Sequence, residues 1–299
     1  MGNGMGDEGQ GIGAAGQGSG VAPRRPAYFR VFLTFARNSL VRDMTFRGNF
    51  LIEAVTSLGW VSFNLVFYLL IFRYTPMIGA GSGWGRDEFL VFFSTSLLVN
   101  SLVQTLFMVN LDDLSDLIRT GALDFALLKP IDAQFLISLR RIDWSSMANF
   151  VCGLALLAYA LVRAHCFPGA AAMVLYPLYV VCGVAVYYSF MIAMAAASVW
   201  MGRNLTLLDF WFYITTFSRY PMEIYDGPLG WPLRQFFTFI IPVLIVVNVP
   251  ARLVARPLWP RTAAEWSLPL FAVLATLASL AVSRWIFQRA LASYRSASS

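Results

Sequence analysis

The sequence predicts an all-α integral membrane protein, and three observations carry this prediction. Hydrophobic residues make up 58% of the 299 residues and charged residues 13%, against about 45–50% and about 25% in ordinary soluble domains. Aromatic residues reach 15%, which is more apolar surface than a soluble chain of this length can bury. The apolar residues also form long runs, several of them near the roughly 20 residues that a helix needs to cross a bilayer core about 30 Å thick.

The N-terminal part divides into a tail and an amphipathic helix. Residues 1–27 are predicted to be disordered, because nine glycines fall within the first 22 residues and few apolar side chains offset the entropy of ordering them. Residues 28–299 are predicted to form one transmembrane domain. Within it, residues 28–44 combine apolar side chains at helical spacing with arginines, the pattern of a helix lying at the membrane interface. The positive-inside rule then places the N-terminus in the cytoplasm.

Six transmembrane helices are predicted from the apolar runs, at about 50–72, 89–111, 145–162, 178–200, 205–220 and 268–287. The charge-free run 166–202 would be about 55 Å long as one helix. Pro177 is therefore expected to separate an interfacial segment from the fourth span. Six crossings return the C-terminus to the cytoplasm, in agreement with Arg289 and Arg295 after the last run.

Residues 228–250 do not fit an ordinary span. The apolar run 236–249 has only fourteen residues, is broken by Pro242 and is closed by Pro250. Irregular backbone persists at membrane depth only where it is buried in protein. We therefore expect an extracytoplasmic re-entrant hairpin before the last span.

The rare residue types exclude several kinds of chemistry. The chain has one lysine, Lys129, and it precedes Pro130, so the P-loop sequence, which needs a lysine next to serine or threonine, is absent. The single histidine, His165, excludes multi-histidine metal sites. The arginines are scattered between apolar runs, which argues against nucleic-acid binding despite a net charge of +6. We expect no catalytic residue, metal or cofactor on this chain.

The segment between the second and third runs, residues 112–143, is unusually acidic and is predicted to be cytoplasmic. Its aspartates are Asp112, Asp113, Asp116, Asp124, Asp132 and Asp143. Leu111, Leu114, Leu117 and Ile118 fall on one face of a short helix that Gly121 is expected to end, and a second apolar patch spans 123–128. The segment is either a solvated loop with a helix on the membrane or a docking element for a cytoplasmic partner, because exposed leucines rimmed by charge are typical of interaction surfaces.

Two sequence motifs carry a family resemblance. Residues 118–131 resemble the signature I-R-T-G-x-L-D-F-x-L-L-x-P-I of uncharacterised ABC transporter permeases of the type-2 export family. The later run 219–251 is similar to the second motif of that family, although Gly230-Trp231-Pro232 departs from its pattern. The resemblance extends from about Tyr28 to the C-terminus.

The resemblance implies the membrane-spanning permease subunit of an ATP-driven exporter in the bacterial cytoplasmic (inner) membrane. Such a subunit is not an enzyme and works with a separate cytoplasmic ABC ATPase, which binds ATP and magnesium, and with a second permease subunit, identical or related. The matching positions for ATPase coupling are Asp116, Ile118, Arg119, Gly121, Leu123, Asp124, Phe125, Leu128, Lys129 and Pro130. Those of the re-entrant element are Pro221, Tyr225, Arg234, Pro242 and Pro250.

Two acids within the predicted spans leave alternatives open. Glu53 and Asp209 lie in apolar runs, and intramembrane acids often serve transport. They are candidates for the substrate path of an exporter. They also allow an ATP-independent secondary transporter or channel that uses them for ion coupling. A non-transporting membrane scaffold is the third interpretation.

Overall fold

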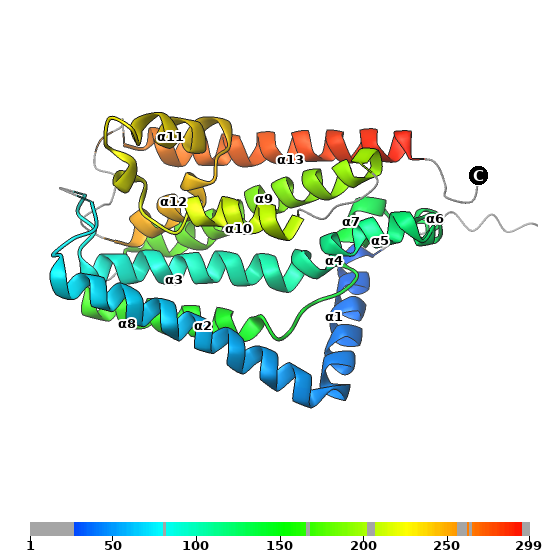
Figure 1. Cartoon of the computed structure of the whole chain (residues 1–299), viewed down its shortest axis with the longest axis horizontal. Coiled ribbons are helices and arrows are strands. Elements are labelled where there is room, and N and C mark those ends of the chain that lie inside the picture. The colour runs from blue at the N-terminus through cyan, green and yellow to red at the C-terminus, as the bar shows by residue number, and fades with distance from the viewer. Residues whose placement is uncertain are drawn as a thin grey trace, which may run out of the picture.

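The computed structural model describes residues 27–79, 82–165, 168–201, 207–255, 262 and 265–294. Within this part of the chain the structure is built of helices and turns, without a strand. Most helices run along a common axis, and α1 lies across one end of the bundle (Figure 1). The all-helical prediction is confirmed for these residues, whereas the predicted tail lies outside them except for its last residue.

The helices follow one another with short connections. The first half contains α1 (Tyr28–Thr45), α2 (Arg47–Tyr74), α3 (Arg86–Val103), the π-helix η1 (Gln104–Met108), α4 (Val109–Asp112), α5 (Leu114–Arg119), α6 (Ala122–Leu127) and α7 (Ala133–Leu139). The second half contains α8 (Met147–Arg163), α9 (Ala170–Met201), α10 (Leu207–Phe217), the 3-10 helix η2 (Met222–Tyr225), α11 (Trp231–Gln235), the π-helix η3 (Phe236–Ile240), α12 (Leu244–Val254) and α13 (Ser267–Ser293).

Four helices are long and apolar enough to cross a membrane, namely Arg47–Tyr74, Arg86–Arg119, Ala170–Trp200 and Ser267–Ser293. A bent pair, Trp231–Ile240 with Leu244–Val254, makes five if it is one span. The apolar helix α8 has 17 residues. α10 has 11, about 16 Å of helix, which is shorter than a bilayer core. The prediction of a multi-pass membrane protein is confirmed, whereas six separate spans stay a prediction.

Two hydrogen bonds between distant side chains mark the opposite ends of the bundle. Trp84 Nε1 donates to Glu223 Oε2 at 2.9 Å, at the end that we call the α11 end (Figure 1). Trp200 Nε1 donates to Ser293 Oγ at 2.7 Å, at the end that we call the α6 end. Between residues 200 and 223 the chain therefore passes from one end of the bundle to the other.

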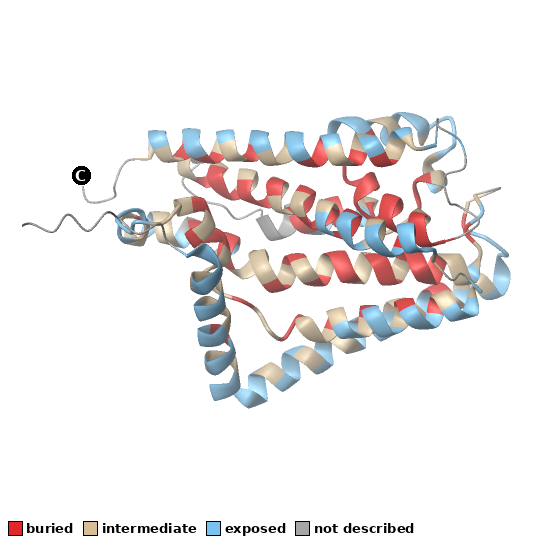
Figure 2. Cartoon of the chain, turned by 180° about the vertical axis from the view of Figure 1, so that it is seen from behind, coloured by how far each residue is buried: buried red, intermediate tan, exposed pale blue. Residues whose placement is uncertain are grey.

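The helix α9 forms the centre of the core. It packs against α3, α12 and α13, and Tyr187, Met191 and Ile192 are fully buried within it. α2 is the opposite case, since Val61 and Tyr68 are the only buried residues among its 28. The contrast is visible in Figure 2. A helix that is apolar all round but packed on one side needs an apolar environment on the other, which lipid supplies.

The expectation that Pro177 divides α9 is wrong. The helix is continuous from Ala170 to Met201 with Pro177 inside it. Proline removes one backbone donor, but packing on both sides of this position holds the helix together. Tyr176 hydroxyl is 3.0 Å from Thr95 Oγ1, and Tyr179 is buried. At 32 residues, α9 is about 48 Å long and must tilt or project beyond the bilayer core.

The bent pair before the last helix agrees with the sequence at Pro242 and disagrees at Pro250. The two halves meet at 91°, and Pro242 lies between η3 and α12 as expected. Pro250 does not end the helix but lies buried inside α12. It leaves the carbonyl of Val246 without the helical donor that residue 250 would supply. That carbonyl faces Gly183 of α9, where an added Cβ would lie only 2.8 Å from the oxygen.

This close approach of α9 and α12 predicts the effect of one methyl group. Replacement of Gly183 by alanine (G183A) forces the buried backbones apart, and we expect it to lower the free energy of unfolding by about 1–3 kcal/mol. Thermal unfolding in a mild detergent measures the loss. The matched control is G59A in α2, where nothing lies within 4 Å of the new Cβ. Equal free energies of unfolding for G183A and G59A would contradict the close approach of α9 and α12 at Gly183.

Candidate functional site

The acidic segment 112–143 lies at the α6 end and folds into short helices. One set of apolar residues points inward, since Leu114 and Leu123, with Leu111 just before the segment, are fully buried, and Leu117 and Ile118 pack against the same core. The helical face expected from the sequence is therefore the face that meets the bundle. Burial of this face fixes which residues of the segment remain outside.

A left-handed glycine joins α5 to α6. Gly121 has φ +70°, a conformation that costs other residues energy, and nothing lies within 4 Å of a Cβ added there. Backbone geometry, and not space, therefore requires glycine at this turn. Before the turn, Thr120 donates through its hydroxyl to the Asp116 carbonyl at 2.7 Å, and Arg119 pairs with the Asp116 carboxylate on the surface.

The helix α6 and its C-cap residue expose three large apolar side chains, of which Leu127 is the least exposed. Phe125 is 73% exposed and Leu128, at its C-terminal end, is 81% exposed, although Leu123 of the same helix is buried. Asp124 lies near Tyr294 at the end of α13, where burial and then the Asp124 charge raise the pKa of the tyrosine. Lys129 and Pro130 follow as exposed residues. The segment therefore presents an apolar patch at the end of the bundle, outside the span-length helices.

The helix α7 was not predicted, and it connects the segment to the long helices. Its N-cap, Asp132, accepts a hydrogen bond from the Phe135 backbone at 2.9 Å and forms an ion pair with Arg284 of α13. Gln134 donates to the Tyr188 hydroxyl of α9 at 2.9 Å, and Ser138 lies 2.9 Å from the same hydroxyl. An aspartate two residues after Pro130 and before an apolar run is a helix-start signal that could have revealed α7.

The other end of α7 is tied to the end of α4. Asn110, which is fully buried, exchanges two hydrogen bonds with the Arg141 backbone, at 2.7 and 2.9 Å. Asp113 forms ion pairs with Arg140 and Arg141 at 3.0 and 2.7 Å. Asp113 is the N-cap residue of α5, but its side chain makes no capping hydrogen bond there. These contacts make residues 110–141 one connected unit.

The helix α1 is attached to the same unit. Ser39 Oγ accepts from the Ile142 backbone at 3.0 Å, and Trp144 Nε1 donates to the Ala36 carbonyl at 3.1 Å. Tyr28 makes an edge-to-face contact with Phe135 of α7 at 5.0 Å. α1 therefore lies across the α6 end, held by side chains that precede α8.

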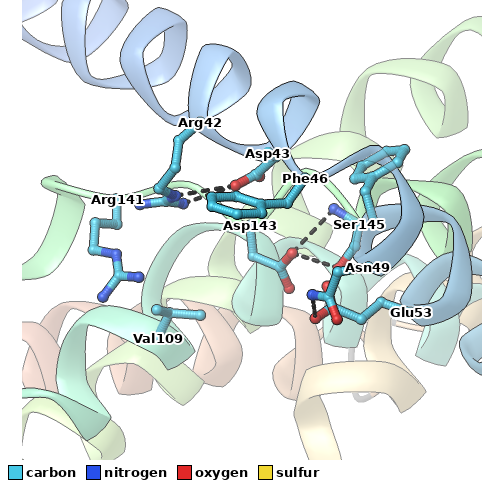
Figure 3. Close-up of a pocket in the computed structure, with 10 residues that line it drawn as sticks. Arg42, Asp43, Phe46, Asn49, Glu53, Val109, Arg141, Asp143 and Ser145 are labelled. Carbon is cyan, nitrogen blue, oxygen red and sulfur yellow. Dashed lines mark hydrogen bonds and ion pairs between the residues drawn. The ribbon is translucent and has the colours of Figure 1, made fainter.

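Glu53 lies in an open cavity of about 750 Å³ between α1, α2 and residues 141–145 (Figure 3). The carboxylate is exposed and accepts from Asn49 Nδ2 at 2.6 Å. The neighbouring acid Asp143 accepts from both Ser145 and Ser146. Asp209 belongs to α10, but its side chain is outside the described residues. The two acids singled out in the sequence are thus not seen to share one site.

The second motif forms an anchored cluster at the α11 end. Glu223 accepts from Trp84 and forms an ion pair with Arg252 of α12, a pairing that was not predicted. Asn248 accepts from the Met222 backbone at 2.9 Å. Pro221 precedes η2, the Tyr225 hydroxyl donates to the Phe217 carbonyl at 3.2 Å, and Arg234 pairs with Asp226. These contacts hold the bent helix pair against the loop before α3.

This architecture defines a multi-pass helical membrane protein with polar clusters at both ends of its bundle. The family model described as ABC-2 family transporter protein matches residues 58–298, and the chain belongs to that family. It is therefore a membrane subunit of the ABC transporter permease type, and membership implies association with an ABC ATPase. No curated protein and no solved structure gives a significant match to the chain.

The ion pair between Asp132 and Arg284 makes stability depend on pH. The hydrogen bond from Arg284 holds the pKa of Asp132 below its ordinary value, so the pair stabilises the fold above about pH 4 and is lost as pH falls through the lowered pKa. We expect Asp132→Asn, which keeps a helix cap, to cost about 1 kcal/mol at pH 7. The loss should disappear in strong acid.

Thermal unfolding of the wild-type protein and of the Asp132→Asn variant between pH 7 and pH 3 measures this effect. The control is Asp116→Asn, because Asp116 and Arg119 form an exposed pair that contributes little. A deficit of the Asp132 variant that stays constant over the whole pH range would show that the charge of Asp132 is not its cause.

Proposed function

We propose that this chain is the permease subunit of an ATP-driven exporter and that a separate ABC ATPase docks on α5 and α6. The observation that carries the proposal is the exposure of Phe125 and Leu128 at the α6 end. They follow Gly121 in the motif that resembles the coupling region of type-2 export permeases. Family membership supports an ATPase partner, and the direction of transport comes from the resemblance alone.

The exposed patch has the composition of a docking surface. Phe125 and Leu128 extend outside the span-length helices, so lipid does not cover them if the α6 end faces the cytoplasm. Burial of each against a partner would contribute about 2 kcal/mol. The charged residues Asp116, Arg119 and Lys129 of the same segment are exposed and would supply the polar rim of an interface with this apolar centre. The buried side chain of Leu123 and the left-handed turn at Gly121 fix the position of α6 and therefore of the patch.

Movement of the docked segment would reach the bundle through α7. Asp132 links α7 to α13, and the Tyr188 hydroxyl links it to α9. Arg140 and Arg141 tie it to Asp113 at the beginning of α5. Closure of an ATPase dimer that binds ATP and magnesium would therefore displace α3, α9 and α13 together, as a rigid-body transition.

The proposal includes a topology of six spans with both termini in the cytoplasm of a bacterial inner membrane. α8 and the stretch that contains α10 supply the crossings beyond the four long helices, and the passage between Trp200 and Glu223 supports the second of these. The bent pair α11 to α12 then enters and leaves on the extracytoplasmic side. A second permease subunit, identical or related, and lipid would cover the exposed sides of α2 and α13.

Glu53 and Asp209 stay candidates for the substrate path. The ion-coupled alternative would need an acid that is shielded from solvent, and the described acid Glu53 is exposed. No described feature favours that alternative over the exporter.

Docking is tested by photo-crosslinking in native membranes. A photoreactive phenylalanine analogue at Leu128 should crosslink to a chain that contains a P-loop sequence, identified by mass spectrometry. The same analogue at Leu229, which is 92% exposed, should not, because that residue lies near the α11 end. We expect the double variant F125A/L128A to lower ATPase association at least tenfold without loss of membrane insertion, since neither side chain packs inside the bundle. Undiminished association would contradict the docking assignment.

Topology is tested by cysteine labelling at two exposed leucines. After replacement of the three native cysteines by alanine, Leu229→Cys should react with an impermeant maleimide on spheroplasts. Leu128→Cys should react only after the membrane is permeabilised. Labelling of both variants on intact spheroplasts would show that the two ends lie on the same side and would overturn the topology.

A further inference from the structure

A groove of about 390 Å³, lined by both polar and apolar side chains, lies between α2, α3, α10 and the start of α8. It extends along α2 from Ser57 to Tyr68, about 16 Å of helix, and both α2 and α3 are span-length. Hydroxyls and amides line it, from Ser57, Asn64, Ser96, Asn100, Ser101, Gln104, Asn149 and Thr215. Trp60, Trp211 and Phe212 supply aromatic walls.

So many hydrogen-bonding groups at membrane depth need an explanation. Polar side chains cost free energy next to lipid unless they are paired or face a polar ligand. Several are paired within their own helix, as Asn64 is with the Trp60 carbonyl and Asn100 with that of Ser96. Asn149 differs. It is only 8% exposed and donates to Ser57 Oγ, but its Oδ1 has no hydrogen-bond partner. The lining of the groove therefore contains a buried, unpaired amide oxygen, and a rotation of the Asn149 side chain would present it to a hydroxyl or amide of a ligand.

The described lining of the groove also includes one cation. Arg219 lies at the end of the groove toward the α11 end, and no aspartate or glutamate is among the described residues that line it. In the part of the chain that the structure describes, no ion pair involves Arg219. Its guanidinium lies over the Phe212 ring, 5.6 Å from the centroid. A guanidinium provides planar donors that match phosphate or carboxylate oxygens.

We infer that the groove binds the head group of the transported molecule and that this molecule is an anionic, hydroxyl-bearing amphiphile. The inference rests on the proposed function and names its substrate class. Hydroxyl groups would meet Asn149 and the neighbouring amides, and the negative charge would meet Arg219. The apolar part would stay against the exposed side of α2. Cationic amphiphiles are disfavoured, because Arg219 is the only charged residue among the described residues that line the groove.

Three amphiphiles with the same twelve-carbon chain separate the contributions. They are dodecyl glucuronide, dodecyl glucoside and dodecyltrimethylammonium, each used below its critical micelle concentration. Binding to the full chain in lipid nanodiscs is measured by microscale thermophoresis. We expect the glucuronide to bind most tightly and the trimethylammonium compound most weakly.

Variants assign the preference to residues. R219Q should weaken glucuronide binding about tenfold, the change that 1.4 kcal/mol corresponds to, and leave glucoside binding unchanged. R219K keeps the positive charge and should therefore keep most of the preference for the anionic glucuronide. N149L should weaken both sugar compounds alike. The control R163Q removes an exposed arginine at the end of α8, outside the groove.

Two results would overturn the inference. One is binding of dodecyltrimethylammonium as tight as that of the glucuronide, and the other is unchanged glucuronide affinity in R219Q, provided that both proteins unfold at the same temperature. The assay contains no ATPase, and the crosslinking test contains no amphiphile. Failure of the substrate class therefore leaves the docking assignment standing, and failure of docking leaves the binding result readable.

Discussion

The connection of α7 to α9 and α13 is the interaction on which the α6 end depends. The segment that precedes it is made of helices of four to six residues, which are too short to be stable alone. They keep their positions because Leu114 and Leu123 are buried and because Asp132, Gln134 and Ser138 bond to the long helices. An exposed patch on α6 is useful for docking only if it is held in this way.

The opposite end follows the same principle with different residues. Glu223 joins three parts of the chain, since it contacts Trp84 before α3 and Arg252 in α12. The sharp bend at Pro242 is tolerated because α12 is buried almost completely and packs closely on Gly183. Polar clusters thus secure both ends of the bundle, and the groove with Arg219 lies between them. This arrangement suits the proposed coupling, in which a docked ATPase would push one end of the bundle and the helices would move as a unit.

Sequence reasoning worked where the signal is local. The long helices appear close to the predicted positions, because an apolar run of sufficient length is visible in any window. Gly121 ends α5 as expected, since a left-handed turn needs glycine whatever surrounds it. Sequence reasoning failed where contacts between distant parts of the chain determine the local structure. Pro177 and Pro250 both lie inside helices, because neighbouring helices hold the backbone on either side of the missing donor. α7 was missed because it has only seven residues and is stabilised mainly by partners more than fifty positions away.

The sequence by itself determined which stretches are apolar enough for lipid, which residues belong to the two motifs, and that no P-loop or histidine cluster is present. Only the tertiary structure decided which helices are neighbours, that Arg284 pairs with Asp132, and that Asn149, Arg219 and Ser57 line one groove. The physical reason is the distance along the chain between the residues that determine each feature. Helical periodicity and turn conformation depend on residues three or four positions apart, whereas a groove depends on side chains of separate helices that meet only after packing.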